Sequence, residues 1–251
     1  MDETFRKLKS LNIYASLLHL ISGIVMLMVS SDLTVPITGS FLRLDVTTQS
    51  LVPKMDTLFS LKLGPLVASF LFMSAIAHFL VAIPLNNWYN KNLKNQINIA
   101  RWIEYALSSS VMIVVISLLV GMSDVATLIT IFFLNAMMIL FGWMMELHNQ
   151  STDTTNWTSF IFGCIAGIGP WIAIAIYLIS PKSPDNPPTF VYWIFVSLFV
   201  FFNIFALNQV LQYKKTGRWS DYLYGERVYI ILSFVAKSLL AWQVFFGTLR
   251  P

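Results

Sequence analysis

Long apolar segments alternate with short polar segments along the whole chain. Each apolar segment is about 20 residues or longer, which is the length a helix needs to cross a bilayer. Seven such segments lie at 8–30, 62–85, 97–121, 124–147, 157–180, 188–213 and 222–248. The pattern predicts an all-α membrane protein, a bundle of seven transmembrane helices that forms one domain over residues 1–251.

One connection is much longer than the others. Residues 31–61 alternate small polar and β-branched residues, and the stretch Val35-Pro-Ile-Thr-Gly39 precedes Leu42 to Thr48. Alternation of this kind beside Pro and Gly is typical of two short strands joined by a turn. We expect a short β-hairpin in this first exterior loop, capping the bundle, and an irregular loop is the alternative.

The composition agrees with a protein embedded in a lipid bilayer. Hydrophobic residues make up 57% of the chain and charged residues 11%, whereas a soluble domain is about a quarter charged. With a mean hydropathy of +0.70, a water-soluble globule is excluded. The first span is too long for a signal-peptide core and lacks a cleavage pattern, so we expect it to stay in the mature protein.

The placement of basic residues predicts the orientation, because Lys and Arg are retained on the cytoplasmic side. One set precedes the first span or lies in the second and sixth loops: Arg6, Lys7, Lys9, Lys91, Lys94, Lys214, Lys215 and Arg218. The opposite face carries a thinner set: Arg43, Lys54, Lys62, Lys182 and Arg250. We predict a multi-pass cell-membrane protein with a cytoplasmic N-terminus and an exterior C-terminus. Basic residues this few and this close to the membrane do not indicate nucleic-acid binding.

Ionisable side chains inside the hydrocarbon region are costly, so each is a candidate functional group. The deep ones are His19, His78, Glu104 and Lys237, with Arg101 nearer an end of its span. Lys237 lies about halfway along the seventh span, too deep to reach an interface. A lysine there lowers its cost by losing its proton, by pairing with a carboxylate, or by condensing with an aldehyde to a Schiff base.

The third span carries a candidate partner for Lys237. Arg101, Glu104 and Ser108 follow one face at spacings of three and four residues. We expect this face to hold a carboxylate flanked by a guanidinium and a hydroxyl. At a rise of 1.5 Å per residue, Glu104 lies on the order of 10 Å inside its span, within reach of the lysine.

Seven spans, a lysine halfway along the last one and an Arg-x-x-acid pattern in the third together resemble the microbial rhodopsins. Trp102-x-Glu104-Tyr105 followed by serines 108–110, the inside N-terminus and the long first exterior loop resemble the heliorhodopsins. The resemblance covers all seven spans. It implies all-trans retinal bound covalently as a Schiff base on Lys237, with Glu104 as the counterion.

The resemblance also implies a retinal pocket. Beside Arg101 and Ser233, it places Tyr105, Ser108, Ser109 and Met112 along the polyene, and Met138, Ile139, Gly142, Gly169, Pro170, Phe202 and Gln209 nearer the ring. Plain packing is the alternative for these aromatic residues and methionines.

His19 and His78 lie at depths like that of Glu104. If both face inward they form a polar cluster, which in the heliorhodopsins holds the Schiff-base proton transiently; two separate histidines are the alternative.

Two positions differ from a light-driven proton pump. A pump usually has an aspartate four residues before the lysine, where this chain has Ser233, and a carboxylic proton donor eleven residues after the counterion, where it has Val115. Glu104 is then the sole carboxylate counterion. We predict a light-sensing photoreceptor with a slow photocycle and no net ion pumping.

Two other functions stay open. A proton transporter of the same fold, light-driven or light-gated, is the first, and a non-retinal seven-helix protein with a buried Lys–Glu bridge is the second. Metal-ligand spacing, a nucleophile elbow and a phosphate loop are absent from the sequence, so neither a metal nor an enzyme is expected. The resemblance implies a homodimer, and a sensor implies a cytoplasmic signalling partner.

Overall fold

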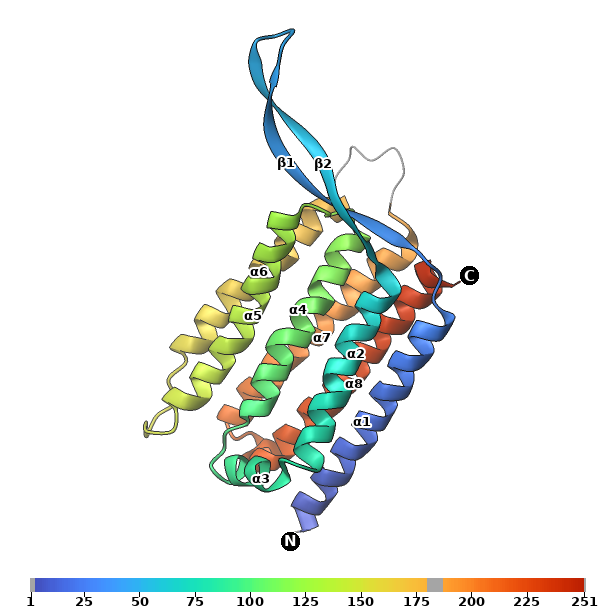
Figure 1. The fold of residues 1–251 in the computed structure, drawn as a ribbon. Helices are drawn as coiled ribbons and strands as arrows, with labels where there is room; N and C mark the ends of the chain where they lie inside the picture. The colour runs from blue at the N-terminus through green and yellow to red at the C-terminus, as the bar shows by residue number, and fades with distance from the viewer. Residues whose placement is uncertain (1–2, 180–186, 251) are drawn as a thin grey trace.

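The computed structural model describes residues 3–179 and 187–250, so Lys182 lies outside the described residues. Within this part, seven helices are long and apolar enough to cross a membrane. They are α1 (Glu3–Val29), α2 (Leu63–Ala82), α4 (Ile99–Leu119), α5 (Val125–His148), α6 (Thr158–Ile179), α7 (Thr189–Tyr213) and α8 (Tyr222–Val244), which continues into the single π-helical turn η2 (Phe245–Leu249). The predicted seven-helix bundle is confirmed (Figure 1).

The seven helices run side by side in one bundle (Figure 1). Helix α1 packs against α2 and α8, α4 lies between α2 and α5, and α5 packs against α6. Trp171 of α6 meets the rings of Phe195, Phe199 and Phe202 of α7. Helix α4 is the most buried, at 67% of its most apolar window. It therefore places its polar residues at the centre of the molecule.

The predicted hairpin is present, but its dimensions differ from the prediction. Strands β1 (Thr34–Asp45) and β2 (Ser50–Lys62) are 12 and 13 residues long and pair antiparallel. Pro36 and Gly39 lie inside β1, so they do not form the turn. The turn is at 46–49, where Asp45 Oδ1 accepts a hydrogen bond from the Thr47 amide at 2.9 Å. This bond holds the pKa of Asp45 below its ordinary value.

The hairpin extends away from the bundle, so the expected cap is wrong (Figure 1). Its base is tied to the helices. The Thr38 amide donates to the Ser123 carbonyl at 2.9 Å, in the connection between α4 and α5. Ile37 is buried against Leu118 and Leu128. Beyond this anchor the strands leave apolar side chains exposed, among them Leu42, Leu44, Leu51 and Met55.

The connection between α2 and α4 also differs from the prediction. It contains a helix, α3 (Asn86–Lys94), rather than a loop, because Tyr89 and Leu93 give it a buried apolar face against Leu8 of α1. Burial raises the pKa of Tyr89 above its ordinary value.

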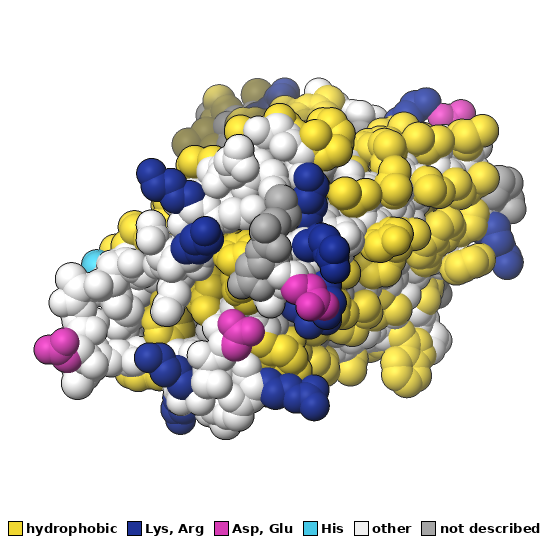
Figure 2. Space-filling view, turned by 90° about the horizontal axis from the view of Figure 1, so that it is seen from below, with side chains coloured by type: hydrophobic (Ala, Val, Ile, Leu, Met, Phe, Trp, Pro, Cys, Tyr) yellow, Lys and Arg dark blue, Asp and Glu magenta, His cyan; other side chains and the backbone are white. Residues whose placement is uncertain are grey.

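Lys and Arg are prominent when the molecule is viewed from the N-terminal end (Figure 2).

Candidate functional site

Helices α4 and α8 bring an acid and an amine together in the core. Lys237 Nζ lies 2.6 Å from Glu104 Oε1 and 2.9 Å from Ser233 Oγ. The lysine is 3% exposed and the glutamate 8%. Side chains on a helix lean toward its N-terminus, so Lys237 reaches back one turn to the level of Ser233. The expected pairing of the two charged groups is thus observed.

A third helix contributes to this pair. Ser74 of α2 donates from Oγ to the same Glu104 oxygen at 2.6 Å. Sequence reasoning missed Ser74, although it stands four residues before His78 and therefore shares its helix face. The ring centroid of Tyr105 lies 5.1 Å from Lys237 Nζ, near enough for a cation–π contact. The amine of Lys237 therefore contacts Glu104, Ser233 and the ring of Tyr105.

The two histidines lie together beside the pair. The rings of His19 and His78 stack with their centroids 5.9 Å apart. His78 Nδ1 is 2.7 Å from Asn12 Oδ1 of α1. Both ring nitrogens of His19, and Nε2 of His78, are buried without a hydrogen-bond partner among the described residues. The geometry is that of a cluster rather than of two separate histidines.

Arg101 lines a cavity together with Glu104, but its guanidinium pairs with other carboxylates. Its guanidinium pairs with Glu146 of α5 at 2.5 Å and with Glu226 of α8. It also lies between the rings of Trp102 and Tyr229, 4.3 and 4.0 Å from their centroids. A guanidinium offers five donors in a fixed plane, and two buried carboxylates satisfy them better than a carboxylate already paired with a lysine.

Sequence reasoning missed Glu146 and Glu226, which are each only 1% exposed. Both lie close to an end of their helix, where a carboxylate is usually solvated. Glu146 accepts from Trp102 Nε1 at 2.6 Å, and Glu226 accepts from Asn98 Nδ2 at 2.6 Å. Asn98 also caps α4 by accepting from the Arg101 amide. The available signal was Arg101 itself, because a buried cation needs an anionic partner.

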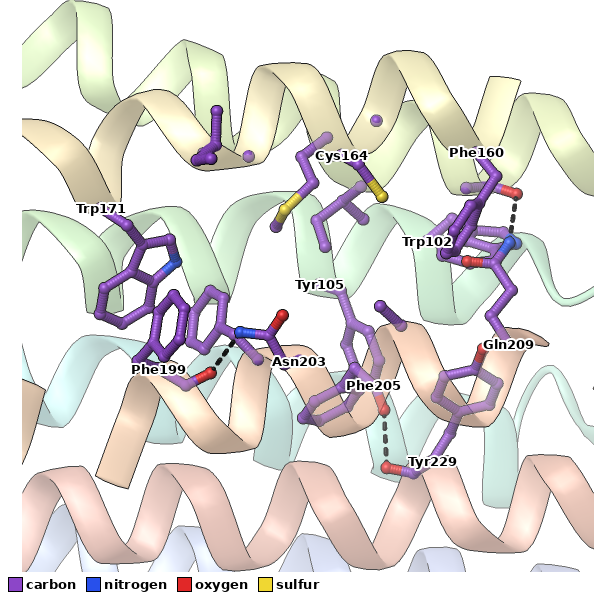
Figure 3. Close-up of a pocket in the computed structure, with 18 residues that line it drawn as sticks. Trp102, Tyr105, Phe160, Cys164, Trp171, Phe199, Asn203, Phe205, Gln209 and Tyr229 are labelled. Atoms are coloured by element: carbon purple, nitrogen blue, oxygen red, sulfur yellow. Dashed lines mark hydrogen bonds between the residues drawn. The ribbon is translucent and has the colours of Figure 1, made fainter. Parts of the chain in front are cut away.

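Two cavities lead away from Lys237. The smaller, about 50 Å³, touches the lysine, and the larger is about 290 Å³. They share five lining residues, Tyr105, Met138, Ile139, Phe202 and Phe205, so the two spaces adjoin. In the larger one, Trp171 and Phe199 lie at one end and Gln209 and Tyr229 at the other (Figure 3). The amine of Lys237 thus opens, through the smaller cavity, onto an elongated and largely apolar space.

Most of the expected pocket residues line these cavities. Ser108, Ser109 and Met112 line the smaller one in addition to the shared residues, and Gly142 and Gln209 line the larger. Gly169 and Pro170 line neither. Helix α6 instead presents Gly163, Gly167 and Trp171, which recur every four residues on one face.

The wall of the larger cavity has room for no side chain at Gly142. A Cβ atom on Gly142 would lie 2.5 Å from the ring of Trp102. That ring cannot easily turn aside, because its Nε1 donates to Glu146. By contrast, a Cβ on Gly169 would meet only Leu134, at an ordinary 3.4 Å.

The chain also matches a family model. The model described as Heliorhodopsin matches residues 8–249 of the 251 residues. A search of curated proteins gives no match. The matched range includes the hairpin and every residue of the site described above.

Proposed function

The chain belongs to the heliorhodopsin family, and from this premise we propose that its retinal is attached as a Schiff base to Lys237, with Glu104 as the counterion. Family membership implies a retinal-based, light-sensing membrane protein. The observation that carries the proposal is the buried contact of 2.6 Å between Lys237 Nζ and Glu104 Oε1. A lysine linked to a cationic chromophore needs such a carboxylate in a low-dielectric core.

The residues around Lys237 fit retinal. The smaller cavity gives the amine access to the larger one, whose walls are mostly aromatic and aliphatic. Such walls suit a polyene, because ligand pockets are mainly apolar with a few placed polar groups. When bound, retinal supplies the absorption of visible light and an isomerisation that displaces the proton on Nζ.

The chain's own residues turn this displacement into stored energy. Glu104 balances the charge on Nζ, Ser74 fixes the carboxylate, and Ser233 accepts a hydrogen bond from Nζ. Separating unit charges from about 4 Å costs up to about 4 kcal/mol at an effective dielectric constant of about 20. The proton on Nζ then moves to Glu104 or the histidines, and the helices adjust as the pair is remade.

The distribution of polar residues favours a sensor over a pump. Toward the N-terminal end, the core around Lys237 holds Glu104, His78 and the ion-paired side chains of Arg101, Glu146 and Glu226. Toward the hairpin end, the interior is a block of buried apolar side chains that includes Phe70, Leu71, Ile113, Ile116, Leu240 and Val244. Among the described residues, the buried titratable partners for a proton leaving Nζ therefore lie on one side only, which supports a slow cycle without net transport.

A transport measurement tests this part of the proposal. Cells or liposomes carrying the retinal-loaded protein should show no sustained change in external pH under illumination. A light-driven change that an uncoupler abolishes would establish a pump instead. A light-gated proton conductance under an imposed gradient would establish a leak, and either result contradicts the sensor without transport.

The two glycines test whether the larger cavity holds the ligand. Gly142→Ala should lower the yield of the visible pigment, since overpacking costs typically about 1–3 kcal/mol and the new methyl group displaces Trp102. Gly169→Ala is the matched control, and it should leave the yield as in the wild type. The measurement is visible absorbance per amount of purified protein after adding retinal. Equal yields from both variants would argue against this cavity.

The orientation and the assembly also belong to the proposal. The basic residues at the N-terminal end support a cytoplasmic N-terminus by the positive-inside rule. A cytoplasmic partner would then detect movements of the helix ends near Arg101. The homodimer remains a prediction from the family.

A further inference from the structure

A third cavity, lined by several charged and polar side chains, lies between Glu104 and the Arg101 cluster, which we define as Arg101, Glu146 and Glu226. Its volume is about 40 Å³, and Glu104, His78, Arg101 and Glu226 all line it. A water molecule needs about 10–15 Å³ of such space together with two to four polar partners. The cavity therefore has room for a short chain of water molecules.

Two lining residues hold polar atoms that call for water. His78 Nε2 and Arg101 Nε are buried, and neither has a hydrogen-bond partner among the described residues. Leaving such an atom unpaired costs about 1–3 kcal/mol. Water in the space that these two residues line would offer both atoms a partner and would connect the histidine side with the arginine side.

The charges in the core give a reason for a proton to move through this cavity. The Arg101 cluster has one guanidinium facing two carboxylates. Ionised throughout, it carries a surplus negative charge away from bulk water, which is unfavourable. One added proton makes the cluster neutral. Glu226 is the carboxylate that both belongs to the cluster and lines the cavity, whereas Glu146 does not line it.

We propose that water in this cavity relays a proton from Glu104 to Glu226 in the light, so that Glu226 holds the proton until the dark state returns. This inference rests on the proposed function, which delivers the proton to Glu104. In the relay the Glu104 O–H bond breaks and leaves its electron pair on that carboxylate. Each water passes on one proton as it accepts another, and an O–H bond forms on Glu226. The reverse path restores the dark state, with no oxidation or reduction.

The relay gives the buried cluster a part in the photocycle. Glu104, ionised again, keeps its hydrogen bond from Ser74 and lines the cavity together with His78. The proton meanwhile weakens the ion pair between Arg101 and Glu226. This pair belongs to the Arg101 cluster, which joins α4, α5 and α8. A light signal near Lys237 thereby reaches contacts between helices at the N-terminal end.

Time-resolved infrared difference spectroscopy on the retinal-loaded, full-length protein tests the relay. The wild type should develop the C=O stretch of a protonated carboxylic acid late in the cycle. That band should be lost in Glu226→Gln and kept, at a shifted frequency, in Glu226→Asp. The aspartate variant is the matched control, since it keeps an ionisable carboxylate opposite Arg101 and beside the cavity. A late band unchanged in Glu226→Gln would overturn the relay.

A second variant keeps the test decisive if Glu226→Gln does not fold. Ala77 lines the cavity and is a member of no ion pair, and Ala77→Leu adds bulk to the space. The dark spectrum should stay as in the wild type, while the late band is lost or delayed. Wild-type kinetics in Ala77→Leu would contradict the relay. Failure of the wild type to form a visible pigment would instead refute the proposed function itself.

Discussion

Replacing Lys237 with alanine should abolish the visible absorption band that retinal gives to the wild-type protein. The side chain supplies the only amine in contact with the smaller cavity among the described residues. The variant also leaves Glu104 buried without its cation, and breaking a buried pair in this way costs about 3–5 kcal/mol. The measurement is the visible spectrum of membranes after retinal is added, scaled to the amount of protein.

Lys237→Arg separates the two effects of that substitution. Arginine keeps a positive charge opposite Glu104, but its guanidinium stays protonated and does not form a Schiff base. We expect protein levels nearer those of the wild type and still no visible band. A visible band of wild-type intensity in either variant would place the attachment elsewhere.

Replacing Glu104 with glutamine should shift the visible absorption strongly to the red. The carboxylate stabilises positive charge at the linkage nitrogen in the ground state more than in the excited state, where the charge moves along the polyene. Removing an interaction of up to about 4 kcal/mol narrows the energy gap between the ground and excited states. The absorption maximum should therefore move to longer wavelength by an amount on the order of tens of nanometres. When the pH is raised, the visible band should also be lost at a lower pH than in the wild type, because the protonated linkage has lost its stabilising carboxylate.

The control for the counterion is Glu104→Asp. It keeps the negative charge and shortens the side chain by one methylene, so its shift should be much smaller than that of the amide. An unchanged spectrum in Glu104→Gln would refute the counterion assignment. Large and equal shifts in both variants would indicate a disturbed pocket rather than a lost charge.

The sequence was informative where a property is local to one helix. Long apolar runs predicted the seven spans, because length and composition suffice to define a membrane helix. The depth of Lys237 and the position of Glu104 were enough to predict that the two charges meet. Both helices run in the same direction, so a simple rise per residue places them.

The sequence failed where the answer depends on helix rotation or on partners in other spans. Arg101 stands one turn from Glu104, and neighbours on a helix were the natural expectation. Its true partners, Glu146 and Glu226, come from α5 and α8, and the rotation of those helices is not encoded in spacing. The α6 wall shows the same limit, because Gly167 rather than Gly169 lines the cavity.

The hairpin was misjudged for another reason. Pro36 and Gly39 are turn-forming residues by propensity, yet both lie within a paired strand. Pairing of twelve residues with the opposite strand outweighs these local preferences. The Asp45–Thr47 contact then closes the turn further along the chain.

Chemical trapping of the linkage tests the central claim most directly. All-trans retinal is added to the full-length protein, and the pigment is reduced with borohydride to convert the linkage to a stable amine. The modified residue is then located by mass spectrometry. The account predicts a visible band, bleached by hydroxylamine in the light, and a retinyl group on Lys237 alone. Absence of the band, or a retinyl group on a different lysine, would contradict it.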